Sequence, residues 1–480
     1  MRATVLRRLS AIVVPLAVLA SACSEPVVPL VQPPATVTPV PAPTPTPAPT
    51  VPNVPTPTPA PFEGEPGISA GEIRIGVIVD ISGDAVNDQL SLSALQAVQA
   101  WASSLNDLGG LVGRQVVVEP IETSPLLADH AVAINIACNR DFFALVGSTA
   151  LFDGDGLDQL ESPQCGIPDF PAVVNSQERL ESRVTTVSNP IVNNLWVAGS
   201  ERWLADTRPD DAAAAATMLL EFPVTLVNGE RMIEAAERQG YEFVHRPQIA
   251  FDTDFVDEAV ALGESEAALL TWRNDGGRLI DLLGQLAAQE IDRPSVVECG
   301  QACYSEAWVD AAGADGDGVS VWLPTLPLEE LDTNAELTRY FFLLSGLDAD
   351  AVPTSTGIAA WASALLFEEA VNIAVGTGTA DFDPNAITRS GVIAAADSIT
   401  QWDARGLHGT SNPSMNVPSA CFVVLTLNNG QWERTFPALR GELDCAADNL
   451  VNLTITTGLG SEDPTPTPEA DPPPEEESEG

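Results

Sequence analysis

Polar side chains stand just after several apolar stretches of the sequence, where a strand would end. The candidate residues are Asp80 near the end of 72–81 with Ser82, Gly83 and Asp84 after it, Ser148 and Thr149 after 142–147, Asn175 at the end of 171–175 with Ser176 after it, Trp272 at the end of 267–272 with Arg273, Asn274 and Asp275 after it, and Tyr304 after 293–299. An aromatic wall with a few convergent polar groups is what a small-ligand cleft needs. The hydroxyls of Ser148 and Thr149, with nearby amides at a helix N-terminus, can hold a carboxylate or another polar group. The pattern predicts a binding site for a small organic molecule.

The residue types that many enzymes use for chemistry are scarce in this chain. No lysine occurs, which excludes lysine Schiff bases, a Walker A lysine and a Ser–Lys dyad. The histidines, His130, His245 and His408, are isolated, and neither HExxH nor a complete GxSxG motif occurs. We therefore predict no catalytic residue, no metal and no cofactor, and we expect each histidine to be structural.

Two aspartate clusters, at 153–158 and 315–318, suggest calcium at first sight. The calcium-loop pattern fails in the first cluster, because Leu157 and Gln164 stand where carboxylate or amide ligands are needed. We expect helix-start carboxylates and a surface turn instead.

The formal net charge is −46, and all 21 basic residues are arginine. Nucleic acid binding needs a basic surface that neutralises phosphates. The composition therefore predicts no nucleic acid partner.

Residues 1–22 are predicted to be a lipoprotein signal peptide. Arginines precede an apolar run at 9–20 that is too short to span a bilayer comfortably, and small residues precede Cys23. These features resemble a bacterial lipoprotein processing site, in which Cys23 is lipidated and anchors the protein to the membrane. Ordinary secretion with cleavage nearby is the alternative.

Two segments have compositions that cannot pack a core. Residues 23–66 are rich in Pro and Thr and predict a disordered, extended stalk, and residues 458–480 form an acidic, Pro-rich disordered tail. The folded part is expected between them.

Six cysteines remain after Cys23, and an even number in an exported chain indicates disulfides. Sequence alone does not fix the pairing, but proximity along the chain suggests Cys138 with Cys165, Cys299 with Cys303, and Cys421 with Cys445. A metal or redox role for the CxxxC pair at 299–303 is the alternative.

Between residues 67 and 458 the hydrophobic pattern alternates strand and helix. Strands are predicted at 72–81, 115–122, 142–147, 171–175, 223–228, 241–248, 267–272 and 293–299, with helices between them that include 91–108, 210–222, 229–240, 255–263 and 276–289. The glycines of GGLVGR (109–114) are expected to end the helix at 91–108. Alternation of this kind implies parallel sheets covered by helices on both faces, and a chain this long favours two lobes. Open parallel sheets bind ligands at the carboxyl ends of their strands.

The order of these segments resembles a known family. IRIGVIVDISGDA, ASSLNDLGGLVGRQVVVE, FFALVGSTA and GIPDFPAV resemble the N-terminal lobe of the periplasmic substrate-binding proteins of branched-chain amino-acid type ABC transporters. AFDTDFVDEAVALGESEAALLTW and DGGRLIDLLGQLAAQEID resemble the second lobe, STGIAAWASALLFEEAVNIA its returning helix and LTLNNGQWERTFP its closing strand pair.

The resemblance implies the type I periplasmic binding protein fold: an α/β protein with two Rossmann-like lobes joined by a three-crossing hinge. Lobe one would comprise 67–187 and 322–399, and lobe two 188–321 and 400–457. A ligand would be held in the cleft between them, which closes by hinge motion.

The sequence departs from the family's amino-acid binders at two places. Leu151, followed by Phe152, stands where those binders place a serine four residues after the glycine that aligns with Gly147, and Asp80 and Ile81 replace a proline in the first loop. The ligand is therefore left open among amino acids, amides, peptides, aromatic acids and other small organic molecules.

The resemblance predicts a lipid-anchored extracytoplasmic solute-binding protein, not an enzyme, that delivers a small molecule to the permease subunits of an ABC transporter. A ligand-sensing lipoprotein of the same fold without a permease is the first alternative. An anchored hydrolase is the second.

Overall fold

The computed structural model describes residues 64–124, 129–190, 194–348 and 351–454. The predicted signal peptide, the lipidation site Cys23, the stalk up to residue 63 and the acidic tail lie outside the described residues.

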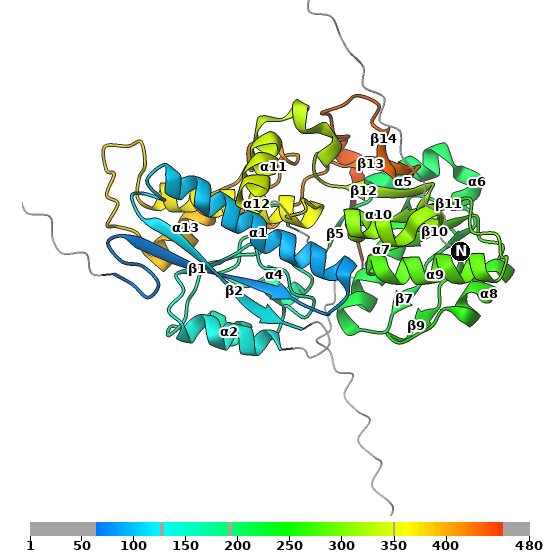
Figure 1. The fold of residues 1–480 in the computed structure, drawn as a ribbon, viewed down its shortest axis with the longest axis horizontal. Coiled ribbons are helices and arrows are strands. Elements are labelled where there is room, and N and C mark those ends of the chain that lie inside the picture. The colour runs from blue at the N-terminus through cyan, green and yellow to red at the C-terminus, as the bar shows by residue number, and fades with distance from the viewer. Residues whose placement is uncertain (1–63, 125–128, 191–193, 349–350, 455–480) are drawn as a thin grey trace, which may run out of the picture. The chain divides into compact units, whose positions relative to one another are not determined.

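Strands and helices alternate through most of the described chain (Figure 1). The strands are β1 (Glu72–Asp80), β2 (Gln115–Thr123), β3 (Ala144–Val146), β4 (Asp169–Phe170), β5 (Leu195–Val197), β6 (Ala215–Ala216), β7 (Leu219–Leu220), β8 (Phe243–His245), β9 (Gln248–Ile249), β10 (Leu269–Trp272), β11 (Val296–Cys299), β12 (Val319–Leu323), β13 (Val423–Asn428), β14 (Gln431–Phe436) and β15 (Leu450–Asn452). The α-helices are α1 (Ala85–Asp107), α2 (His130–Asn139), α3 (Leu157–Leu160), α4 (Gln177–Leu180), α5 (Gly199–Thr207), α6 (Pro209–Ala212), α7 (Pro223–Arg238), α8 (Val256–Glu264), α9 (Gly276–Ala288), α10 (Glu306–Ala312), α11 (Ala335–Leu347), α12 (Ser355–Ala374) and α13 (Arg389–Ala396). The 3-10 helices are η1 (Gln301–Cys303), η2 (Gly313–Gly316), η3 (Leu328–Thr333), η4 (Ala404–Gly406), η5 (Pro413–Met415) and η6 (Ala447–Asn449).

The first sheet is parallel and has the strand order β2-β1-β3-β4; we call it the four-stranded sheet. Alternate side chains of a strand point to opposite faces. Ile75 and Val77 of β1 accordingly pack into the core that contains α1 and α12, whereas Ile78 packs with α2 on the other face. Figure 1 shows α1 and α2 on opposite sides of β1 and β2.

The second sheet has the order β14-β13-β12-β11-β10-β6-β8; we call it the seven-stranded sheet. Strands β6, β8, β10, β11 and β12 run parallel, and β13 and β14 join antiparallel at one side. Leu279 and Leu282 of α9 pack on one face of this sheet, and Met232 and Ile233 of α7 pack on the other. Two small pairs, β5 with β15 and β7 with β9, complete the strands of the described residues.

Helix α12 is largely apolar, and most of its residues belong to the core of the four-stranded sheet. By length and composition it could cross a membrane, but 67% of its apolar window is buried inside the protein, as expected of a core helix. Trp361 and Phe367 are among its fully buried side chains.

Three segments differ from the sequence predictions. The stretch 210–222 was expected to be helical but forms only the end of α6 and then β6 and β7, while 223–228, expected to be a strand, is the first part of α7. Pro223 begins α7 because its fixed φ suits the first helical turn. Pairing of β6 between β10 and β8 overrides the helix propensity of its alanines. The strand expected at 171–175 lies earlier in the sequence, as β4 (Asp169–Phe170).

The glycine-rich stretch after α1 ends that helix as predicted. Gly110 has φ +86°, and its amide donates to the carbonyl of Leu105 at 2.8 Å. A Cβ atom on Gly110 would lie 2.0 Å from the carbonyl oxygen of Arg114, so the reversal into β2 needs glycine on both grounds.

The predicted disulfide pairing is confirmed: Cys138 bonds to Cys165, Cys299 to Cys303, and Cys421 to Cys445. The first ties α2 to the loop before β4, and the second joins the end of β11 to η1.

Candidate ligand-binding site

A cavity of about 740 Å³ is lined by residues that follow the parallel strands of both sheets. Asp80 ends β1 and Thr149 follows β3 in the four-stranded sheet; Thr217 follows β6 and Arg273 follows β10 in the seven-stranded sheet. The carboxyl ends of parallel strands are where open α/β sheets bind ligands. The volume is in the range of small-molecule sites.

The structure brings part of the predicted set to this cavity. The predicted residues that line it are Ser82, Asp84, Thr149, Asn175, Arg273 and Asn274, together with Asp80 and Asp275. Gly83, Ser148, Ser176, Trp272 and Tyr304 are not among the lining residues. The part that any of these residues takes in ligand binding stays a prediction.

The predicted residues that do not line the cavity have structural partners. The Ser148 hydroxyl accepts the amide of Ile78 at 3.1 Å, and the Ser176 hydroxyl caps α4. The Gly83 amide donates to Asp88 at 3.0 Å.

The two aromatic residues expected at the cleft surface are instead buried. Trp272 is 0% exposed, and its indole donates to the carbonyl of Asp275. Tyr304 donates to Glu329 at 2.6 Å and accepts the amide of Leu328. Both rings belong to the core of the seven-stranded sheet, so the aromatic wall of the cavity comes from other residues.

The aromatic and apolar wall was missed by sequence reasoning. Among its members are Leu151, Trp196, Met218, Leu220, Phe251 and Trp322. Trp322 lies near the end of β12, and a position at a strand end is the signal that indicated the other candidates. Trp196 belongs to β5, whose pairing with β15 no local sequence pattern indicates.

Asp80 is held by two donors at the cavity wall. One carboxylate oxygen accepts the Thr123 hydroxyl at 2.5 Å and the other accepts the amide of Leu151 at 2.7 Å. Burial raises the pKa of the Asp80 carboxyl. The backbone amide of the loop after β3 is therefore already hydrogen-bonded to a carboxylate of the protein itself.

Arg273 is held by two buried glutamates. Its guanidinium donates to Glu201 at 3.1 Å and to Glu298 at 2.8 Å, and the side chains of both glutamates are at most 1% exposed. Burial raises the pKa of Glu201. The positive charge of Arg273 is thus balanced by the two buried carboxylates of Glu201 and Glu298.

Arg278 is also engaged. Its guanidinium donates to the carbonyls of Ala250 at 3.3 Å and Thr253 at 3.0 Å, and it lies over the ring of Phe255 at 4.9 Å from the centroid. Its own amide is capped by Asp275, whose pKa is raised by burial.

Two contacts near the cavity link residues beside the four-stranded sheet to residues beside the seven-stranded sheet. The Asn228 side chain donates to the carbonyl of Asn175 at 3.2 Å, and the rings of Phe152 and Phe222 meet edge to face at 5.5 Å. Residues that belong to the two sheets are therefore in direct contact beside the cavity.

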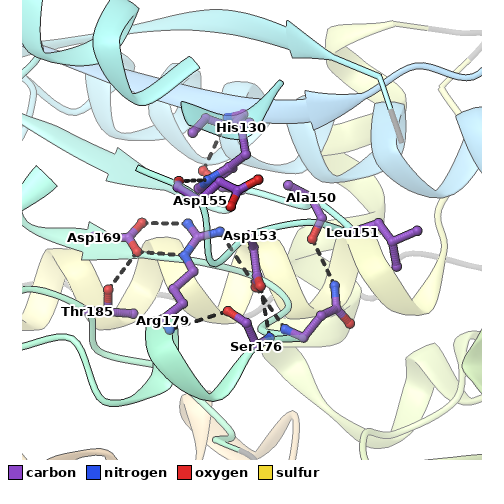
Figure 2. A network of polar contacts seen from close by, with 12 residues as sticks. His130, Ala150, Leu151, Asp153, Asp155, Asp169, Ser176, Arg179 and Thr185 are labelled. Carbon is purple, nitrogen blue, oxygen red and sulfur yellow. Dashed lines mark hydrogen bonds and ion pairs between the residues drawn. The ribbon is translucent and has the colours of Figure 1, made fainter. Parts of the chain in front are cut away.

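Asp153 of the first aspartate cluster belongs to a buried network next to the cavity wall (Figure 2). Asp153 accepts the amides of Asn175 at 2.8 Å and Ser176 at 2.9 Å, and Arg179 donates to both oxygens of Asp169. Asp153 is 0% exposed and so does not lie in a surface turn, whereas Asp158 lies in the first turn of α3, as expected of a helix-start carboxylate. Its carboxylate orders the loop that carries Asn175 to the cavity.

One serine–histidine pair occurs away from the cavity. The Ser188 hydroxyl lies 2.9 Å from Nε2 of His408, whose Nδ1 faces the carbonyl of Gly409 at 2.7 Å. Ser188 and His408 are 4% and 3% exposed, and the Trp402 indole donates to the same hydroxyl. Nδ1 of His408 thus faces a backbone carbonyl at the place where a hydrolase triad has a carboxylate, and both side chains are buried, so the geometry is that of a structural bridge.

Comparison with known proteins agrees with this geometry. Residues 201–431 match the model of a family described as periplasmic binding protein. A fatty acid ABC transporter substrate-binding protein from Thermomonospora curvata has a similar structure, with a TM-score of 0.66 at 17% identity over 81% of this chain and 96% of that chain. The leucine binding protein LivK from Thermotoga maritima gives 0.60 at 12% identity over 79% and 98%. A solute-binding protein from R. palustris in complex with benzoate gives 0.60 at 16% identity over 76% and 95%. The search of curated proteins found no match.

The described chain has the type I periplasmic binding protein fold, a fold of binding proteins. The predicted resemblance to the periplasmic binding proteins of the leucine-binding type is confirmed, by structure over most of the chain and by the family model over residues 201–431.

Proposed function

We propose that this protein is an extracytoplasmic solute-binding protein that captures a small organic molecule in the cavity between its two sheets and delivers it to an ABC permease. The observation that carries the proposal is the cavity itself, which is lined by residues following parallel strands of both sheets.

The mechanism follows from a ligand that contacts both sides of the cavity. Such a ligand binds the closed state better than the open state and shifts the equilibrium toward closure. The Phe152–Phe222 and Asn228–Asn175 contacts would form together with that closure and help to hold it.

Lipidation at Cys23 and the Pro/Thr-rich stalk belong to the same proposal. About forty residues of extended chain at about 3.1 Å each would let the binding domain reach roughly 100 Å from the membrane. That reach would allow a membrane-anchored protein to capture solute and still meet permease subunits in the same membrane.

Thermal melting of the purified, exported chain against amino acids, amides, short peptides, aromatic acids and fatty acids tests the proposal. A ligand at a hundred times its dissociation constant adds about 2.7 kcal/mol of stability, which corresponds to a rise of a few degrees in the melting temperature. At least one compound is expected to give such a shift. A folded protein that none of the compounds stabilises would contradict the proposal.

A further inference from the structure

We propose that the cavity takes an uncharged organic ligand with an apolar body and a hydrogen-bond acceptor, such as an amide or ester carbonyl, in preference to a free carboxylate. This inference rests on the proposed function and specifies its ligand class.

The first argument is the place that Asp80 occupies. A ligand carboxylate in the loop after β3 would use the backbone amide there, but the amide of Leu151 already donates to Asp80 at 2.7 Å. A second carboxylate at the same place would lie beside the first, and like charges at short range disfavour each other.

The second argument is the state of the cavity arginines. Arg273 meets two glutamates, so that cluster carries more carboxylates than cations. Nη2 of Arg278 is shared between two backbone carbonyls, and its guanidinium lies over an aromatic ring. The Nε atoms of Arg273 and Arg278 have no hydrogen-bond partner among the described residues, so each arginine keeps one donor for an acceptor while its charge is shared with groups of the protein.

Carboxylates also outnumber guanidinium groups along the lining itself. Asp80, Asp84, Asp275 and Asp281 line the cavity with Arg273 and Arg278. An anionic ligand is therefore disfavoured by the balance of charge at the wall as well as by its local partners.

The third argument separates an uncharged ligand from a cation. The indole nitrogens of Trp196 and Trp322 and the hydroxyls of Thr149 and Thr217 have no hydrogen-bond partner among the described residues. These residues line the cavity, and the two threonines are 7% and 1% exposed. An indole N–H can only donate, and a hydroxyl can turn to donate, so these groups need an acceptor. An ammonium ion offers none, whereas a carbonyl oxygen offers two lone pairs.

The remaining lining is apolar and suits a hydrocarbon or aromatic body. Leu151, Met218, Leu220 and Phe251 line the cavity. A ligand that is polar at both ends, like a free amino acid, would bury charge against these side chains.

Matched series that differ only in the head group test the inference. The carboxylate, primary amide and primary amine of phenylacetyl, 4-phenylbutanoyl and hexanoyl skeletons are titrated calorimetrically into the full exported chain at pH 7. In at least one series the amide is expected to bind ten times or more tighter than both charged members.

Asp80→Asn tests the cause of the selectivity, because asparagine keeps the shape and can still accept the Leu151 amide. The preference for amide over carboxylate should fall about tenfold, whereas Asp292→Asn, at an exposed position outside the cavity lining, should change it less than threefold. Melting of each variant without ligand checks that it remains folded. An unchanged preference in folded Asp80→Asn would overturn the role of this charge and with it the inference.

The outcomes separate this inference from the proposed function. A carboxylate that binds tightest and loses affinity in Arg278→Met would overturn the inference, and so would an amine that binds tightest or a wider panel in which only charged compounds bind. In each of these cases the protein would still be a solute-binding protein. If no head group and no compound of the wider panel binds, the inference and the proposed function both fail.

Discussion

Two arginines, Arg179 and Arg273, are each held by two carboxylates, but one lies in a closed core and the other lies on the wall of the cavity. Arg179 has no exposed side-chain surface, and its partners are two aspartates of the network beside β4 (Figure 2). The side chain of Arg273 is 13% exposed, and its partners are two buried glutamates. An arginine paired with two carboxylates thus occurs both in the closed core and on the cavity wall. The charge of Arg273 is therefore already balanced by protein carboxylates, although this arginine lines the cavity.

The largest effect is expected in the closed core. Arg179→Ala leaves Asp169 buried without its bidentate partner, which should cost about 3–5 kcal/mol in the free energy of unfolding. Urea denaturation measures this cost. The matched control is Arg440→Ala, which breaks an exposed pair with Asp332 and should leave the free energy of unfolding nearly unchanged. Equal losses in the two variants would mean that burial does not set the strength of these pairs.

A smaller loss is expected at the cavity wall. Arg273→Met should destabilise the protein by about 2–4 kcal/mol at pH 7, because two glutamates lose their partner but solvent and protonation can relieve them. Burial raises the pKa of Glu201, so the loss should be smaller at pH 5 than at pH 7. Denaturation at the two pH values checks this, and a loss that grows on acidification would contradict it.

The closed core should also show two opposite pH dependences. Burial lowers the pKa of His130 to about 4, so its contribution to stability is lost as pH falls from about 6.5 toward 4. Burial raises the pKa of Asp153 to about 6, so its contribution to stability increases as pH falls from about 6 toward 3.8. The two contributions oppose each other in the native protein.

Substitution should separate the two contributions. The free energy of unfolding of each variant is compared with that of the native protein at pH 7.5 and at pH 4.5. On going to pH 4.5, this difference should change in favour of His130→Asn and against Asp153→Asn, by about 2 kcal/mol each. Melting curves of the three proteins at both pH values give the differences. Shifts of the same sign in both variants would show that one of the two assignments is wrong.

The smallest effect concerns an aromatic contact next to residues that line the cavity. Phe152 and Phe222 should show a coupling of about 1 kcal/mol in ligand affinity, because aromatic pairs at this distance are worth about 0.5–1.5 kcal/mol beyond burial. A double-mutant cycle with alanine at both positions measures the coupling for whichever compound the melting panel identifies. Strictly additive losses would mean that the two rings do not act together in the bound state.

The sequence predicts the elements better than the orientation of side chains. Alternating strands and helices indicated parallel sheets, and the ends of the strands led to Asp80, Thr149 and Arg273 at the cavity. Trp272 was misplaced because β10 is buried on both faces, so its sequence lacks the alternation that would show which way each side chain points. The partner of Arg273, Glu201, lies 72 residues away, and no local pattern reports such a contact.

The central claim is that ligand binds in this cavity, and calorimetric titration of two neighbouring variants on α1 tests it most directly. Ser91 lines the cavity, whereas Leu92 is 42% exposed and is not among the lining residues. With the compound found by the melting panel, Ser91→Trp should lose at least a hundredfold in affinity, because the indole would fill part of the cavity, and Leu92→Trp should stay within threefold of the native protein. If both variants are folded and bind alike, the ligand lies elsewhere and the account is wrong.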